Sequence, residues 1–260
     1  MKIVVCVKQV PNTANVKIDP VTGTMIREGV ESIINPDDLA AVEAALRIKE
    51  QSGGEIIALT MGPLQADKAL RECLAMGVDK AILLSDRLFA GADTWVTSLV
   101  LSKAIEMIQP DLVIAGRQAI DGDTAQVGPQ IAEHLKIPSV AYVSQIDVIE
   151  DGFIVKRDFE DRYYRIKVKK PCLMTVLKEL NKPRYMNVRK IYQAFQEGLV
   201  VVWDNSYLNI SVDQLGLKGS PTKVKKSFTK GAKSAGKIFD VSPGEAATII
   251  IDKLKENYVL

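Results

Sequence analysis

Residues 111–129 read DLVIAGRQAIDGDTAQVGP, and this stretch decides the fold of the chain. Its first five residues are an apolar run typical of a buried strand. Residues 130–135 place apolar side chains at the spacing of a helix, and the residues in between are mostly small or polar. The stretch therefore predicts a strand, a connecting loop and the beginning of a helix.

The predicted loop suits an anion, but it also suits an ordinary strand-to-helix connection. The first turn of a helix leaves backbone N–H groups unpaired at the positive end of the helix dipole, and glycine lets a ligand approach closely. Helix caps explain the same residues, so the spacing alone favours neither interpretation. Neither a G-x-G-x-x-G nor a G-x-x-x-x-G-K-[ST] phosphate loop occurs in the sequence.

The composition is that of a globular protein with one large domain, or one domain and an extension. The chain has 260 residues, 47% hydrophobic and 25% charged, and its net charge of +2 is too small to imply a nucleic-acid or membrane partner. No apolar run approaches the roughly 20 residues of a membrane span, and the start of the chain lacks the features of a signal peptide. The scattered cysteines, Cys6, Cys73 and Cys172, predict a cytoplasmic location.

Apolar runs alternate with helical patterns through the first half of the chain, which predicts a doubly wound, mostly parallel sheet. The runs cover residues 3–7, 55–61, 80–85 and 111–115. Ligands of such sheets bind beyond the carboxyl ends of the strands. We therefore expect the strand ends at residues 7–8, 60–62 and 115–116 to converge on one site.

The pattern changes after Pro138. Residues 140–176 predict an antiparallel hairpin region added to the sheet, and residues 181–190 predict a polar loop. We expect residues 1–195 to form the α/β domain, and residues 196–260 to form an extended C-terminal arm and a helix that dock on a partner subunit. Residues 218–237 hold seven lysines but no arginine and one aromatic residue, which favours a solvated arm over a nucleic-acid surface.

The sequence predicts neither a catalytic residue nor a metal site. His134 is the only histidine, and we expect it to have a surface or packing role; no G-x-S-x-G motif and no metal-ligand spacing accompanies it. The carboxylate pairs Asp37 with Asp38 and Asp121 with Asp123 stand where helix-capping residues belong. Capping is therefore the preferred interpretation over acid–base catalysis.

Five segments of the sequence occur in the order found in one known family. They are residues 5–11, residues 35–38 leading into 41–46, residues 75–79, residues 116–123 with Gln126 and Gly128, and Asn181 with residues 183–185. Through them the chain resembles the β subunit of electron-transfer flavoproteins over nearly its whole length. The family's signature in the hairpin region keeps its ending at residues 171–175, whereas Arg162 and Arg165 depart from it.

The resemblance implies a Rossmann-like fold for adenine nucleotides, paired with an α subunit that carries the redox-shuttling FAD. Backbone amides of residues 123–127 would hold the phosphates of the β subunit's own nucleotide, and side chains near Cys6 and Met61 would flank the adenine. The cofactor-binding residues implied in this way are Cys6, Val7, Lys8, Asn35, Asp38, Met61, Gly62, Gly116, Arg117, Gln118, Ala119, Ile120, Asp121, Gly122, Asp123, Thr124, Ala125, Gln126 and Val127.

The polar loop resembles the recognition loop with which the family docks an acyl-CoA dehydrogenase. The matching residues are Pro183, Arg184, Tyr185, Met186 and Val188, of which Val188 is the candidate apolar anchor.

Members of this family hold either AMP as a structural filler or, in the electron-bifurcating group, a second FAD that takes a hydride from NADH and splits the two electrons. Residues 35–38, residues 22–24 with Arg27, and residues 183–186 resemble the bifurcating group. We therefore expect FAD, enclosed in part by residues 8–27, within an NADH-oxidising complex that also serves a ferredoxin-type acceptor. A simple electron carrier with structural AMP is the alternative.

Two interpretations from other classes share the fold. A nucleotide-binding sensor resembling the universal stress proteins explains neither the recognition loop nor the lysine-rich arm. An ATP pyrophosphatase would match residues 52–55 only faintly, because they follow a predicted helix and lack the final serine of that loop.

Overall fold

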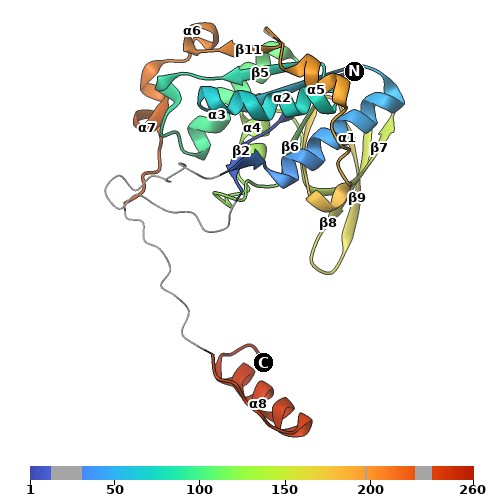
Figure 1. Ribbon diagram of the computed structural model, residues 1–260, viewed down its shortest axis with the longest axis vertical. Coiled ribbons are helices and arrows are strands. Elements are labelled where there is room, and N and C mark those ends of the chain that lie inside the picture. Colours follow the sequence, from blue (N-terminus) through green and yellow to red (C-terminus); the bar gives the residue numbers. More distant parts are fainter. Residues whose placement is uncertain (13–30, 197, 226–235) are drawn as a thin grey trace. The chain divides into compact units, whose positions relative to one another are not determined.

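The computed structural model describes residues 1–12, 31–196, 198–225 and 236–260 (Figure 1). Contacts divide the chain into two units, Met1–Ser227 and Phe228–Leu260. Most of the loop at residues 8–27, including residues 22–24 and Arg27, lies outside the described residues, as do residues 226–235 of the lysine-rich arm.

The first unit is built on a nine-stranded sheet with the order β11-β5-β4-β1-β6-β10-β7-β8-β9. The strands from β11 to β7 run parallel, and β7, β8 and β9 form an antiparallel meander at one edge. Their bounds are β1 Lys2–Cys6, β4 Glu55–Met61, β5 Lys80–Leu84, β6 Leu112–Gly116, β7 Ser139–Ile149, β8 Gly152–Asp158, β9 Tyr163–Lys169, β10 Cys172–Val176 and β11 Val200–Trp203. A separate antiparallel pair joins β2 (Gln9–Pro11) and β3 (Ser32–Ile34).

Helices cover both faces of the sheet, as the alternating pattern predicted (Figure 1). Successive residues of β1 point to opposite faces: Ile3 and Val5 pack in one buried cluster with α1 (Pro36–Ser52) and α2 (Asp67–Met76). Val4 and Cys6 pack in a second cluster with α3 (Thr94–Ile108) and α4 (Val127–Leu135). The doubly wound fold class is therefore confirmed.

Short helices complete the first unit. They are α5 Val188–Ala194, α6 Asn205–Leu208 and α7 Gly216–Gly219, together with the 3-10 turns η1 Leu64–Ala66, η2 Arg87–Phe89, η3 Lys178–Leu180 and η4 Val212–Gln214. The second unit contains α8 (Pro243–Glu256), whose Ser242 and Glu245 form a capping box. None of the helices in the described ranges is long and apolar enough to cross a membrane.

The region at residues 140–176 is antiparallel only in part. β10 lies between β6 and β7 and is parallel to both, and all five of its residues are buried. An unbroken apolar strand covered on both faces is typical of a parallel interior position, which is why β10 differs from the hairpin that precedes it. The hairpin turn between β8 and β9, residues 159–162, is exposed and projects beyond the paired residues Asp158 and Tyr163.

The division between the units lies at Ser227 rather than at residue 195, because β11 pairs with β5 along Val200–Trp203 and so belongs to the sheet. Whether the remainder of the chain docks on a partner stays a prediction. Another difference concerns α4, which begins at Val127 rather than near Thr124.

Candidate functional site

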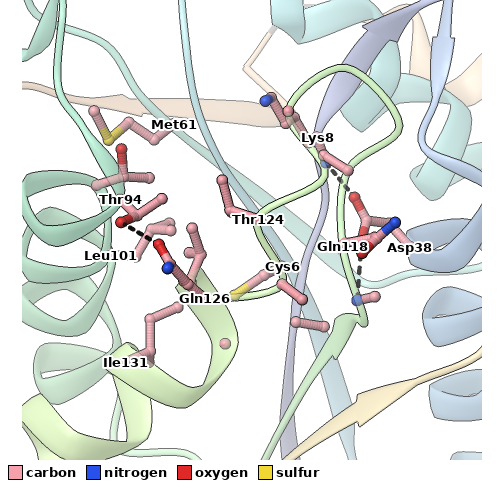
Figure 2. A pocket seen from close by; sticks show the side chains of 18 of the residues that line it. Cys6, Lys8, Asp38, Met61, Thr94, Leu101, Gln118, Thr124, Gln126 and Ile131 are labelled. Carbon is pink, nitrogen blue, oxygen red and sulfur yellow. Dashed lines mark hydrogen bonds between the residues drawn. The ribbon is translucent and has the colours of Figure 1, made fainter. Parts of the chain in front are cut away.

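A cavity of about 400 Å³ lies at the carboxyl ends of β1, β4 and β6 and at the start of α4 (Figure 2). The three strand ends meet there, as expected for a doubly wound sheet. Cofactor-binding residues predicted from the sequence that line it are Cys6, Val7, Lys8, Asp38, Met61, Gly116, Arg117, Gln118, Ala119, Gly122, Asp123, Thr124, Ala125, Gln126 and Val127. The predicted residues Asn35, Gly62, Ile120 and Asp121 lie outside the lining.

One wall of the cavity was missed by the sequence analysis. It comes from the segment that follows η2 and from the first turns of α3, where Asp93 accepts a hydrogen bond from the Val96 amide at 3.1 Å and so caps the helix. The available signal was Asp93-Thr94, which has the residue types of a helix start and follows the strand that ends at Leu84. The additional lining residues are Leu59, Ala92, Asp93, Thr94, Thr97, Leu101, Ala115, Gly128 and Ile131.

The loop before α4 offers a row of backbone donors to this cavity. The N–H groups of residues 124–128 find no acceptor in the part of the chain that the structure describes, although all five residues line the cavity. Asp123 and Ala125 have φ angles of 49° and 52°, and Gln126, which follows Ala125, is right-handed with φ −103° and ψ −33°. Such a change of hand turns successive amides to one side and makes a concave anion site. The loop can therefore bind a phosphate through its main chain.

Both aspartates of the loop are hydrogen-bonded by neighbouring side chains. The Asp121 carboxylate accepts from Lys8 Nζ at 2.8 Å, and the Asp123 carboxylate accepts from Gln118 Nε2 at 2.8 Å. Neither residue caps α4, whose N-cap is Gln126, so the capping interpretation was wrong for this pair. The Lys8 cation offsets the charge of Asp121 and so lowers the repulsion that an anion in the cavity would meet, whereas Asp123 keeps its charge.

Asn35 fixes the middle of the loop from outside the cavity. It is fully buried, donates from Nδ2 to the Gln118 carbonyl at 2.8 Å and accepts at Oδ1 from the Ile120 amide at 3.1 Å. Although Asn35 stands at the N-cap of α1, its side chain makes no cap hydrogen bond. The Asn35 side chain therefore holds the loop and does not cap its own helix.

Asp38 joins two strand ends in the same way. One carboxylate oxygen accepts from the Lys8 amide at 2.8 Å and the other accepts from the Gly116 amide at 3.0 Å (Figure 2). Burial raises the pKa of Asp38 to about 7. A Cβ on Gly116 would come within 2.3 Å of Asp38 Oδ1, so only glycine permits this approach. The capping interpretation was wrong for Asp38 as well, because its bonds reach other segments.

One side of the cavity carries several large apolar side chains. Figure 2 shows Met61, Leu101 and Ile131 on the side away from Lys8 and Asp38, with Cys6 between the two sides. Burial raises the pKa of the Cys6 thiol to about 12, so the thiol remains neutral. On the same side as Leu101, Gln126 Oε1 accepts a hydrogen bond from Thr94 Oγ1 at 3.0 Å (Figure 2). Apolar side chains beside a row of amides suit a flat heteroaromatic base joined to a phosphate.

The predicted docking loop lies on α1 rather than at the cavity. The Arg184 guanidinium donates from Nε to Glu43 Oε2 at 2.8 Å and from Nη1 to Glu50 Oε1 at 2.5 Å. This anchor leaves the neighbouring apolar side chains in solvent: Tyr185 is 93% exposed and Val188 is 82% exposed. The loop therefore presents the kind of surface that a protein partner covers.

His134 packs as predicted: its ring lies 4.6 Å from that of Trp95 and 3.2 Å from Ser98 Oγ. No group of side chains suited to a metal ion was found among the described residues.

The comparisons with known proteins point to one family. Residues 22–204 match the model of the electron transfer flavoprotein domain. The chain is 54% identical, over the full length of both chains, to the electron transfer flavoprotein subunit beta of Clostridium acetobutylicum. It is 53% identical to the caffeyl-CoA reductase–Etf complex subunit CarD of Acetobacterium woodii and 45% identical to the acryloyl-CoA reductase electron transfer subunit gamma of Anaerotignum propionicum, again over the full length of both chains.

Proposed function

The chain belongs to the electron transfer flavoprotein family, as a β subunit, and on that basis we propose that its cavity binds the adenine nucleotide portion of FAD. The bound flavin would exchange electrons with NADH, a ferredoxin-type acceptor and an acyl-CoA dehydrogenase-type partner by electron bifurcation.

The row of amides at residues 124–128 carries this proposal. Five consecutive residues, whose N–H groups have no acceptor among the described residues, line a cavity in which Asp121 is paired with Lys8 and several side chains are apolar. That combination binds a phosphate and an attached heteroaromatic ring without any lysine donating to the phosphate. Neither nucleic acid nor a metal ion is needed to explain it.

The residues of the cavity fit an adenine cofactor in distinct roles. The amides of residues 124–127 would hold the diphosphate, and Cys6, Met61 and Leu101 would enclose the adenine. Asn35 and Asp38 would keep the loop and the two strand ends in place through the bonds described above. A bound flavin supplies the hydride and single-electron chemistry; the chain's own part is to bind it, orient it and shield it from water.

Two sets of observations favour the bifurcating type. Two of the relatives are, by their names, electron-transfer subunits associated with CoA reductases. In the sequence, residues 35–38 and 183–186 resemble the bifurcating group. The first of these segments contains Asn35 and Asp38, whose side chains hydrogen-bond to the residues that line the cavity. A non-bifurcating β subunit that holds structural AMP in the same cavity is the alternative.

The α subunit completes the assembly, since electron transfer flavoprotein β subunits pair with α subunits. We expect α8 to dock on it, because Ile250 and Ile251 are 59% and 45% exposed. The loop with Tyr185 and Val188 is then left for the acyl-CoA dehydrogenase-type partner.

Counting the cofactors tests the proposal. The heterodimer is purified, its flavin is quantified by visible absorbance after denaturation, and AMP is quantified by chromatography of the released nucleotides. Two flavins per heterodimer support FAD in this subunit. One flavin with one AMP excludes FAD and leaves the simple carrier, and the absence of any nucleotide from the β cavity contradicts the site itself.

A further inference from the structure

Asp37 touches both the loop that lines the cavity and the segment that leads into the docking loop. It stands in the first turn of α1 and is 7% exposed. Its Oδ2 lies 3.6 Å from Nε of Arg117, which lines the cavity. Its Oδ1 accepts from the amide of Lys178 at 3.2 Å, where η3 begins. One carboxylate therefore joins two segments that are 61 positions apart in the chain.

The contact between Asp37 and Arg117 is the looser of the two. The Arg117 Nε atom is buried and has no hydrogen-bond partner among the described residues, because the Asp37 oxygen is too distant. A buried guanidinium nitrogen without an acceptor is costly, and Arg117 carries further donors beside a cavity built for an anion. Arg117 is thus poised to move toward a ligand.

The docking loop has its other anchors on the same helix. Asn181 donates from Nδ2 to the Ala40 carbonyl at 3.0 Å, and the amide of Arg184 donates to Glu43 at 3.1 Å. The cavity loop is fastened to the first turn of α1 through Asn35 and Asp38. Helix α1 is therefore a common support. Among the described residues, the Asp37 side chain lies beside both Arg117 of the cavity lining and Lys178, which precedes the docking loop; the Arg117 amide also donates to the Val176 carbonyl at 2.9 Å.

We propose that Asp37 is a positioning residue that couples nucleotide binding in the cavity to the order of residues 178–188, an inference that rests on the proposed function. An anionic ligand draws the Arg117 guanidinium into the cavity. The Asp37 carboxylate, losing that cation, then strengthens its bond to the Lys178 amide and holds the segment that leads into the docking loop. By thermodynamic reciprocity, a partner that orders the docking loop tightens nucleotide binding by the same factor.

Hydrogen exchange read by mass spectrometry tests this coupling. The heterodimer is stripped of small molecules, and AMP is used as the probe because it carries the phosphate and adenine without a flavin. Binding is first measured by calorimetry. At saturating AMP, exchange of the Lys178 amide is expected to slow by about fivefold or more, in the range typical of coupled sites, with a smaller effect at the Arg184 amide.

Asp37→Asn keeps an acceptor for the Lys178 amide but removes the charge that attracts Arg117, so AMP should no longer change exchange in residues 178–188. Glu179→Gln is the matched control: it removes one negative charge from the neighbouring position, where the side chain is 65% exposed, and the response should persist. Arg117→Gln breaks the same link from the cavity side and replaces Asp37→Asn if that variant does not fold.

The outcomes separate the two proposals. If AMP binds but leaves exchange at residues 178–188 unchanged, or changes it equally in Asp37→Asn, the coupling is wrong and the cavity assignment stands. If neither AMP nor FAD binds the stripped heterodimer, the proposed function fails, and the coupling fails with it.

Discussion

The Arg184 guanidinium lies 2.8 Å from the carboxylate of Glu43, a residue whose side chain is only 3% exposed. Burial would raise the pKa of Glu43, but hydrogen bonds from Arg184 and Arg47 outweigh burial and lower it. Arg184 thus holds the docking loop on α1, because its cation compensates the buried charge of Glu43.

Arg184→Ala should lower the free energy of unfolding by about 2 kcal/mol, less than for a fully buried pair because Arg184 is partly exposed and Arg47 remains beside Glu43. Urea titration at neutral pH measures this. Arg162→Ala, which breaks an exposed ion pair with Asp161, should change stability little. Because the pKa of Glu43 is lowered in the folded chain, the difference in unfolding free energy between the parent chain and Arg184→Ala should decrease as the pH falls through that pKa. Equal effects of the two substitutions would contradict this role for Arg184.

Asp38 should make the chain less stable as the pH rises. Its pKa is raised to about 7 in the folded chain, so between about pH 4 and 7 the folded state holds a proton that the unfolded state has released. Stability therefore falls with pH in that window. Between pH 5 and 8, the difference in unfolding free energy between the parent chain and Asp38→Asn should shift by about 2–3 kcal/mol in favour of the variant. Urea titrations at several pH values measure it, and parallel pH curves would show that Asp38 is ionised throughout.

Asn35→Ala should weaken AMP binding about tenfold, because the Gln118 carbonyl and the Ile120 amide lose their buried partner and the loop is no longer held. Asn205 offers a matched control: it exchanges the same two kinds of hydrogen bond with Ile210, at 2.9 and 3.1 Å. Asn205→Ala should cost similar stability and leave AMP affinity unchanged. Calorimetric titration and thermal unfolding of both variants separate the two effects; a similar loss of affinity in both would show that Asn35 acts through stability alone.

Val188→Glu should impair electron transfer to an acyl-CoA dehydrogenase-type partner about tenfold without altering nucleotide content. Val188 is 82% exposed, so the substitution leaves the fold intact. It introduces an uncompensated charge into the surface on which we propose that the partner docks. Tyr163→Ala changes another exposed hydrophobic residue, on β9, and should have no effect. Partner reduction in a coupled dye assay reports the outcome, and unchanged turnover in Val188→Glu would place docking elsewhere.

The sequence predicted the meeting of the strand ends because parallel strands point their carboxyl ends the same way, whichever side chains they carry. It did not predict where Asn35 and Asp38 bind. An Asn-Pro-Asp-Asp run is a local helix-start signal, and that signal is present, since Pro36 opens α1. The side chains instead reach the loop about 80 positions later, and no local pattern reports so distant a partner.

Other differences have equally specific causes. The apolar run at residues 172–176 fits a parallel or an antiparallel strand, and only burial on both faces in the folded chain decides between them. The wall formed by Thr94, Thr97 and Leu101 belongs to a helix whose pattern is that of ordinary core packing. β11 is a four-residue strand, too short to be distinguished from a loop by periodicity.

The exposed turn at residues 159–162 has a practical consequence. It lies at the free edge of the meander, on strands that pair only with β7 and each other, so added residues there disturb neither the cavity nor the docking loop. A fluorescent label or a short affinity tag inserted in this turn would report assembly with the α subunit in real time, leaving both chain termini in their native form.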